Sequence, residues 1–180
     1  HGASDPGRYG PRQSSAVELA EALLAIGDLF GPIDAVVAHS LGALSSGYAV
    51  QRGLEVRRLA LVAPMVDAPS YTAPFVTALG AGPRIRRQMV AAIETRIGRR
   101  LADFDLTLLP LSMLPPTLLV HDEVDPETRY EDTAELARMW PQARLVTTRG
   151  LGHQRILRDP GVVAEVVGFL TGVPAGTVDL

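Results

Sequence analysis

The chain has 180 residues, of which 47% are hydrophobic and 21% charged, and these values are typical of one globular domain with a substantial core. A net charge of −3 gives no reason to expect a nucleic-acid partner or an anionic membrane, and no apolar run is long enough for an integral membrane segment. The absence of cysteine excludes disulfides, thiolate metal ligands and a thiol nucleophile.

The first predicted helix follows a loop. Residues 1–13 are rich in Gly, Pro, Asp and Arg, a composition typical of loops. Ser15 and Glu18 have the spacing of a capping box, which predicts a helix over residues 16–30. The Gly-Pro pair directly after residue 30 ends it.

The next segment joins a buried strand to a helix through a serine. Residues 33–38 are mostly apolar and β-branched, and a helical pattern follows over residues 41–52. The turn between them, residues 38–42, reads AHSLG, and its small residues permit a sharp bend. Such a bend exposes the Ser40 hydroxyl and directs the first helical amides, above all that of Leu41, towards it. For the pentapeptide alone, the alternative is a buried strand followed by a Ser-capped helix.

A second buried strand is predicted over residues 57–63, and its continuous apolar run suits a parallel sheet covered on both faces. Residues 66–114 break the pattern with a Pro-, Ser- and Thr-rich beginning, a helix over about 83–100 and a leucine-rich end. Since this segment is too long for a simple crossover, we expect a helical cap inserted between two parts of one core, residues 1–65 and 115–175.

The remaining elements alternate regularly. Strands are predicted over residues 116–121 and 143–148, and helices over residues 128–139 and 159–170, the last opened by an Asp-Pro pair. Strands that alternate with helices predict an α/β fold with a mostly parallel sheet and flanking helices.

A serine hydroxyl needs a neighbouring base to act as a nucleophile near neutral pH. Of the four histidines, His153 alone is predicted to lie in a loop after a strand, next to Gly152. The glycine allows the backbone to bend so that the imidazole reaches across the carboxyl edge of the sheet. A lone loop histidine is more often a polar surface group, but its place after the final strand favours the base.

A base of this kind needs a carboxylate to orient it. The strand over residues 116–121 is followed by several acidic residues, and Asp122, Glu123 and Asp125 are candidates for this carboxylate. For most of these acidic residues, the alternative is a place in a solvated turn. Asp125 lies a few residues beyond the strand, where a loop can turn its side chain inward, and we choose it.

The order of serine, acid and histidine, each after a strand, resembles the α/β-hydrolases, close to small bacterial carboxylesterases and lipase-like hydrolases. Residues 38–42 resemble the G-x-S-x-G motif with alanine in the first glycine position. Residues 122–125 resemble a Gly-x-x-Asp turn with the glycine replaced, and Gly152-His153 matches a Gly-His pair. The resemblance covers nearly the whole chain.

The resemblance implies a serine hydrolase that cleaves a small-molecule carboxylic ester through an acyl-enzyme, without metal or cofactor. Ser40 would be the nucleophile, His153 the base, Asp125 the acid and the Leu41 amide an oxyanion donor. Thioesterase or acyltransferase chemistry is an alternative on the same fold. Candidate substrate contacts are His39 in the turn and, in the cap, Phe75, Met89, Ile93, Ile97 and Phe104. For the cap residues, the alternative role is packing of the cap on the body.

The beginning of the chain departs from the family pattern. Relatives have a His-Gly motif after an earlier strand that completes the oxyanion hole, and His1-Gly2 lies too close to Ser40 to be that motif. We therefore expect the first strands and half of the hole to lie upstream, leaving a sheet of about four strands with an unpaired edge. An impaired fragment or a non-enzymatic interaction module is thus a second hypothesis. No export signal is visible, so a cytoplasmic location is expected; the oligomeric state is not predicted.

Overall fold

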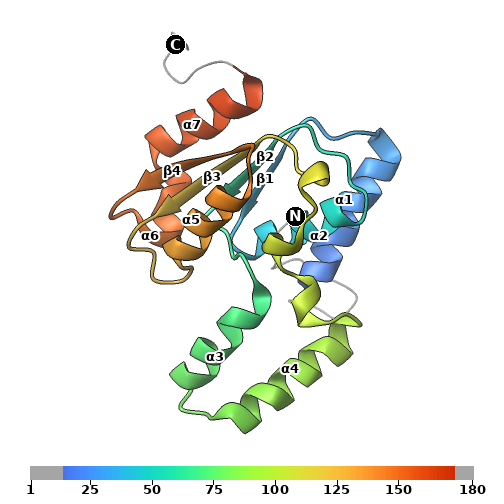
Figure 1. Cartoon of the computed structure of the whole chain (residues 1–180), viewed down its shortest axis with the longest axis vertical. Coiled ribbons are helices and arrows are strands. Elements are labelled where there is room, and N and C mark those ends of the chain that lie inside the picture. The colour runs from blue at the N-terminus through green and yellow to red at the C-terminus, as the bar shows by residue number, and fades with distance from the viewer. Residues whose placement is uncertain (1–13, 173–180) are drawn as a thin grey trace.

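The computed structural model describes residues 14–172; the expectations for residues 1–13, including that for His1-Gly2, lie outside this range. The described chain forms a parallel sheet with helices on both faces, as the sequence predicts (Figure 1). The strands lie side by side in chain order: β1 (Val36–His39), β2 (Leu59–Val62), β3 (Thr117–Asp122) and β4 (Ala143–Thr148).

Five helices occupy most of the segments predicted for them: α1 (Ala16–Phe30), α2 (Leu41–Gln51), α4 (Pro83–Ile97), α5 (Tyr130–Met139) and α7 (Pro160–Thr171). Two more, α3 (Ala68–Ala78) and α6 (Gly152–Arg155), lie where no helix is predicted. Short 3₁₀ helices cover Leu101–Asp103, Leu106–Leu108, Leu111–Met113 and Ile156–Arg158. The capping box of α1 is confirmed, since the Glu18 amide donates to Ser15 Oγ at 3.3 Å and the Ser15 amide donates to the Glu18 carboxylate at 3.1 Å.

The two faces of the sheet bury separate apolar clusters. One face packs against α1, α2 and α5, with a cluster that includes Leu44, Leu59, Leu61, Leu119 and Leu136. The other face packs against α7, with a cluster that includes Ala60, Val62, Leu118, Val120 and Val162. Successive strand residues therefore enter opposite clusters, which explains the continuous apolar runs of β2 and β3.

Within residues 66–114, which we expect to form a cap, α3 and α4 make a hairpin that projects from the body (Figure 1). The sequence pattern does not predict α3, because Pro, Ser and Thr are frequent at its start. There the Asp67 carboxylate caps the helix by accepting from the Ser70 amide at 3.2 Å, and a proline in the first turn is tolerated. Helix α4 ends earlier than predicted because Gly98 adopts a left-handed conformation with φ 67°.

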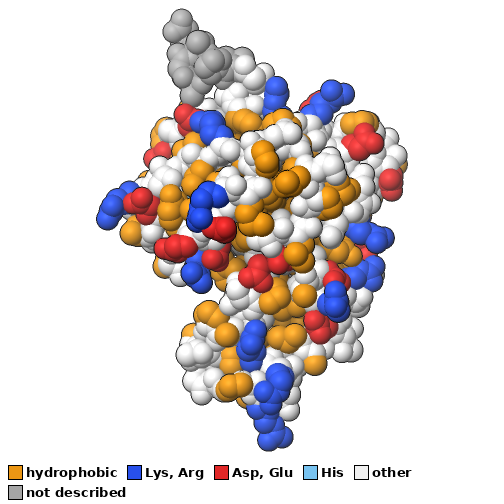
Figure 2. All heavy atoms as spheres, viewed as in Figure 1, with side chains coloured by type: hydrophobic (Ala, Val, Ile, Leu, Met, Phe, Trp, Pro, Cys, Tyr) orange, Lys and Arg blue, Asp and Glu red, His pale blue; other side chains and the backbone are white. Residues whose placement is uncertain are grey.

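The α4 helix of the hairpin packs little against the rest of the chain that the structure describes. No side chain of α4 is buried, and apolar and basic side chains lie next to one another on it (Figure 2). In the described part of the chain, β1 is an edge strand of the sheet, and its Val37 is 53% exposed. Among the described helices, none has the length and apolar character needed to cross a membrane.

Candidate active site

Ser40 sits at the junction of β1 and α2 in a strained conformation. Its φ of 54° and ψ of −122° are rare for a residue with a side chain. Neighbouring strands hold it there, since the Ser40 amide donates to the Val62 carbonyl at 3.2 Å and the Met65 amide donates to the Ser40 carbonyl at 3.2 Å. The side chain makes no capping hydrogen bond to α2. The hydroxyl is thus held at a fixed place without being committed to the helix.

The small residues on either side of Ser40 lie close together. A Cβ atom added at Gly42 would make ordinary van der Waals contact with the Cβ of Ala38, at 3.7 Å, so the two positions face each other across the turn. Leu41 is the first residue of α2, and its amide has no acceptor within the helix. This amide also lies at the positive end of the helix dipole. It can therefore donate to a negative oxygen formed next to Ser40.

His153 and Asp125 form a buried pair. His153 Nδ1 lies 2.8 Å from Asp125 Oδ2, and the side chains are 2% and 0% exposed. His153 lies in the first turn of the short helix α6 rather than in the predicted loop. The turn is reached through Gly152, whose φ of 64° lies in the left-handed region that favours glycine. The structure therefore brings together two residues far apart in the sequence.

Backbone amides hold Asp125 in place. Its Oδ1 accepts from the amides of Glu127 at 2.7 Å and Thr128 at 3.0 Å. Burial alone would raise the pKa of Asp125, but these hydrogen bonds and His153 lower it below its ordinary value. Asp125 is therefore an ionised carboxylate at neutral pH, able to stabilise a positive charge on His153.

Thr128 and His121 complete the buried network. The Thr128 hydroxyl donates to Asp125 Oδ2 at 3.2 Å and lies 3.2 Å from His121 Nε2. His121 Nδ1 in turn lies 2.6 Å from the Thr133 hydroxyl. Sequence reasoning missed Thr128, although it directly follows the acidic run that contains Asp125.

The other two candidate acids have different surroundings. Asp122 accepts hydrogen bonds from the amides of Val124, Gly150 and Leu151 and from the Thr148 hydroxyl. Burial would raise the pKa of Asp122, but these four donors outweigh it and lower the pKa to about 2. Asp122 thus joins the loop after β3 to the loop after β4. Glu123 lies at the surface, 3.2 Å from Arg149 Nη1.

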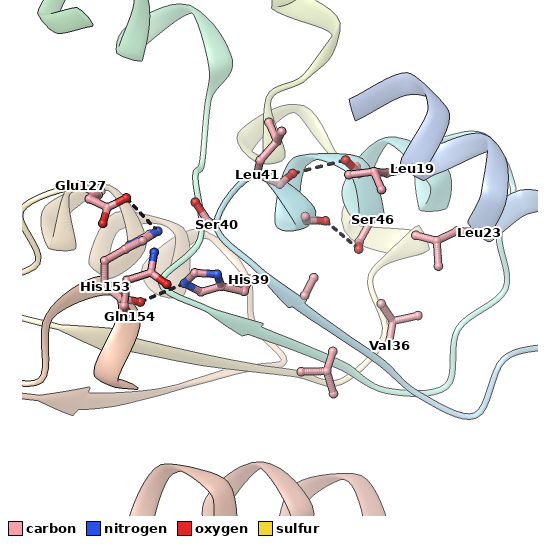
Figure 3. A pocket seen from close by; sticks show the side chains of 14 residues that line it. Leu19, Leu23, Val36, His39, Ser40, Leu41, Ser46, Glu127, His153 and Gln154 are labelled. Atoms are coloured by element: carbon pink, nitrogen blue, oxygen red, sulfur yellow. Dashed lines mark hydrogen bonds and ion pairs between the residues drawn. The ribbon is translucent and has the colours of Figure 1, made fainter. Parts of the chain in front are cut away.

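A pocket of about 620 Å³ lies in front of Ser40. Ser40, Leu41, His39, His153 and Glu127 line it, together with an apolar wall that includes Leu19, Leu23 and Val36 (Figure 3).

Among the described residues, no hydrogen bond joins Ser40 to His153, whose Nε2 lies 3.7 Å from Glu127 Oε2 instead. Bonds between a nucleophile and its base are often long until substrate binds. Sequence reasoning also missed Glu127, which belongs to the acidic run after β3.

The proposed cap contacts lie elsewhere. Phe75 is 57% exposed on α3, and neither it nor Met89 or Ile93 lines the pocket. The hairpin that carries them projects away from the body of the molecule (Figure 1). Phe104 is buried and stacks on Tyr48, with ring centroids 4.7 Å apart. The hairpin therefore does not roof the pocket in this structure, and Phe104 anchors the cap to the body. His39 does line the pocket.

Thermal stability is expected to fall as the pH is lowered from about 7 to 5. Burial lowers the pKa values of His121 and His39 below the ordinary value of about 6.5. The unfolded chain therefore takes up protons first, so their contribution is complete above about 6.5 and lost as the pH falls through the folded pKa values. Unfolding temperatures across this range should decrease for the wild type and decrease less steeply for His121→Asn. Equal slopes would contradict the prediction.

Within residues 14–172, no group of three or more His, Asp or Glu side chains is placed to hold a metal ion. The site combines the half-buried Ser40, a helix-terminal amide and a buried imidazole–carboxylate pair. These groups are the ones that activate a serine and stabilise an oxyanion.

Comparisons with known proteins agree with this architecture. The model of an α/β-hydrolase family described as TAP-like protein matches residues 107–177, a stretch that contains Asp125 and His153. The comparison with curated proteins gave no match.

Solved structures with a similar fold include several α/β-hydrolases. One from Sphaerobacter thermophilus is 25% identical, with a TM-score of 0.58, and the alignment covers 94% of this chain and 79% of that one. An esterase from Pyrococcus furiosus is 17% identical, with a TM-score of 0.61 and coverage of 93% and 66%. A thermophilic esterase from Thermogutta terrifontis is 17% identical, with a TM-score of 0.56 and coverage of 89% and 73%. The chain therefore has the α/β-hydrolase fold, and the family match places its residues 107–177 in that superfamily.

Proposed function

We propose that the chain is a serine hydrolase that cleaves carboxylic esters, with Ser40, His153 and Asp125 as its catalytic residues. The observation that carries the proposal is the buried 2.8 Å contact between His153 and Asp125 beside the strained turn that presents Ser40. The esterases among its structural relatives favour an ester over other acyl substrates.

The reaction would proceed in two halves. His153 Nε2 accepts the Ser40 proton while the serine oxygen attacks the ester carbonyl, and the Leu41 amide donates to the resulting oxyanion. The tetrahedral intermediate collapses, and the alcohol leaves with the proton held by His153. Water then loses a proton to His153, attacks the acyl-enzyme and releases the acid with Ser40 restored. Asp125 keeps a proton on Nδ1 and stabilises the imidazolium in both halves.

The lining of the pocket favours neutral or cationic esters with an apolar acyl part. Leu19, Leu23 and Val36 form an apolar wall, whereas the carboxylate of Glu127 lies near the base. An anionic substrate would meet Glu127 at short range and be disfavoured. Glu127→Gln would weaken this discrimination.

Hydrolysis of p-nitrophenyl esters from acetate to laurate tests the function. The chain is expected to hydrolyse these neutral esters and to be inactivated by one equivalent of a fluorophosphonate, because both reactions need an activated serine. A thioester series and an acyl-acceptor alcohol test the thioesterase and acyltransferase alternatives.

If the chain hydrolyses no acyl compound and is not labelled covalently, this result would contradict the proposal and favour an interaction module. Slow hydrolysis with labelling would instead indicate an incomplete oxyanion hole, since the loss of one donor reduces kcat by about 10²–10³.

A further inference from the structure

We infer that His39 is a positioning residue that holds the backbone of His153, rather than a contact for substrate. His39 Nε2 lies 3.0 Å from the His153 carbonyl oxygen, a bond between the turn of the nucleophile and the helix of the base (Figure 3). The two imidazole rings also pack together, with centroids 4.5 Å apart and planes inclined by 44°. His39 is thus in direct contact with the base and is fixed by β1, on the strand that carries Ser40.

The segment that carries His153 needs such a restraint. It follows two glycines with positive φ, Gly150 and Gly152, whose backbones have more freedom than those of other residues. Asp122 restrains its beginning by accepting from the amides of Gly150 and Leu151. These hydrogen bonds hold the residues before His153 but not His153 itself. The bond from His39 holds the His153 backbone directly and fixes the distance between that backbone and the end of β1.

The bond determines which nitrogen of His39 carries the proton. A carbonyl oxygen only accepts hydrogen bonds, so Nε2 must donate. Burial lowers the pKa of His39, which keeps the ring neutral near pH 7 and leaves Nδ1 unprotonated. His39 is therefore the Nε2–H tautomer, whereas His153 carries its proton on Nδ1, facing Asp125. Two touching histidines are held in opposite tautomers by two different acceptors.

Two substitutions separate the hydrogen bond from the ring contact. His39→Gln can place an amide N–H where Nε2 lies, and His39→Phe keeps an aromatic ring but leaves the His153 carbonyl without this donor. If the bond positions the base, the Gln variant should resemble the wild type and the Phe variant should not. In His39→Phe, kcat and the rate of fluorophosphonate labelling should fall by about 10- to 100-fold, with KM nearly unchanged. His39→Gln should stay within about threefold of the wild type.

This inference rests on the proposed function, so a second readout is independent of activity. Proton–nitrogen NMR of the histidine-labelled 180-residue chain should show His39 as the Nε2–H tautomer and His153 as the Nδ1–H tautomer, with a downfield Nδ1 proton. That proton should exchange faster with solvent in His39→Phe than in His39→Gln. Thermal unfolding of both variants checks that they are folded.

The possible results are distinguishable. A wild-type chain that does not label contradicts the proposed function, while the NMR spectra still decide the role of His39. If the wild-type spectrum shows His39 as the Nδ1–H tautomer, the inference is overturned. This outcome needs only the wild type, so it holds even if a variant does not fold. A Phe variant that labels and protects the His153 proton as the wild type does overturns it as well. A raised KM with unchanged kcat would return His39 to substrate binding.

Discussion

Replacing Ser40 with alanine is expected to reduce ester hydrolysis by at least about 10⁴-fold and to abolish covalent labelling by a fluorophosphonate. The reason is that the acyl-enzyme forms on the Ser40 oxygen, and the neighbouring groups can stabilise an oxyanion but cannot replace the nucleophile. The strain at φ 54° persists in alanine, so the fold should not change. Initial rates with p-nitrophenyl acetate and intact-protein mass spectrometry measure the two effects.

Ser46→Ala is the matched control. Ser46 lines the same pocket, but its hydroxyl donates to the Gly42 carbonyl at 2.8 Å within α2. It therefore has no free hydroxyl to place before a carbonyl carbon, and the variant should retain labelling. If labelling survives in Ser40→Ala and disappears in Ser46→Ala, the nucleophile is Ser46 and the assignment of Ser40 is wrong.

Asp125→Asn is expected to reduce kcat by about 10³- to 10⁴-fold while leaving the chain folded. Asparagine can still accept from the Glu127 and Thr128 amides, but its amide group can donate to His153 Nδ1 and stabilise the tautomer with the proton on Nε2. In that tautomer Nε2 carries a proton and has no lone pair to accept the serine proton. Steady-state kinetics, together with NMR of the His153 ring, measure the loss and its cause.

Asp122→Asn is the matched control for Asp125→Asn, because it removes a nearby buried carboxylate that does not contact His153. Asp122 accepts four hydrogen bonds, as many as Asp125, but its donors are Val124, Thr148, Gly150 and Leu151 and do not include His153. Its replacement should lower the unfolding temperature, because the four donors lose a charged acceptor. Labelling of the folded variant should remain within about tenfold of the wild type. A large kinetic loss in Asp122→Asn and a small one in Asp125→Asn would reverse the two assignments.

Local sequence signals predicted the elements that carry the candidate site. The capping box of α1 and the strand–serine–helix junction at Ser40 depend on neighbours within a few residues, so their patterns are visible in the sequence. The strand ends place Asp125 and His153 at the same edge of the sheet because parallel strands share one direction.

Other features depend on contacts between distant residues. Whether the cap covers the pocket depends on the angle of the α3–α4 hairpin, which no local pattern encodes, and Phe75 is accordingly exposed. Asp122 and Asp125 lie three residues apart in one acidic run, and only the amides that surround each of them separate their roles. The contact between His39 and His153 spans two strand ends and could not be predicted from the turn motif alone.

The most direct test of the central claim is to identify the residue that a fluorophosphonate modifies and to compare its labelling rate with that of His153→Ala. If Ser40, His153 and Asp125 act together, peptide mass spectrometry will place the adduct on Ser40 alone, and the His153 variant will label at least about 10³-fold more slowly. An adduct on another residue, or labelling of Ser40 at the same rate without the imidazole, would contradict the assignment of this site.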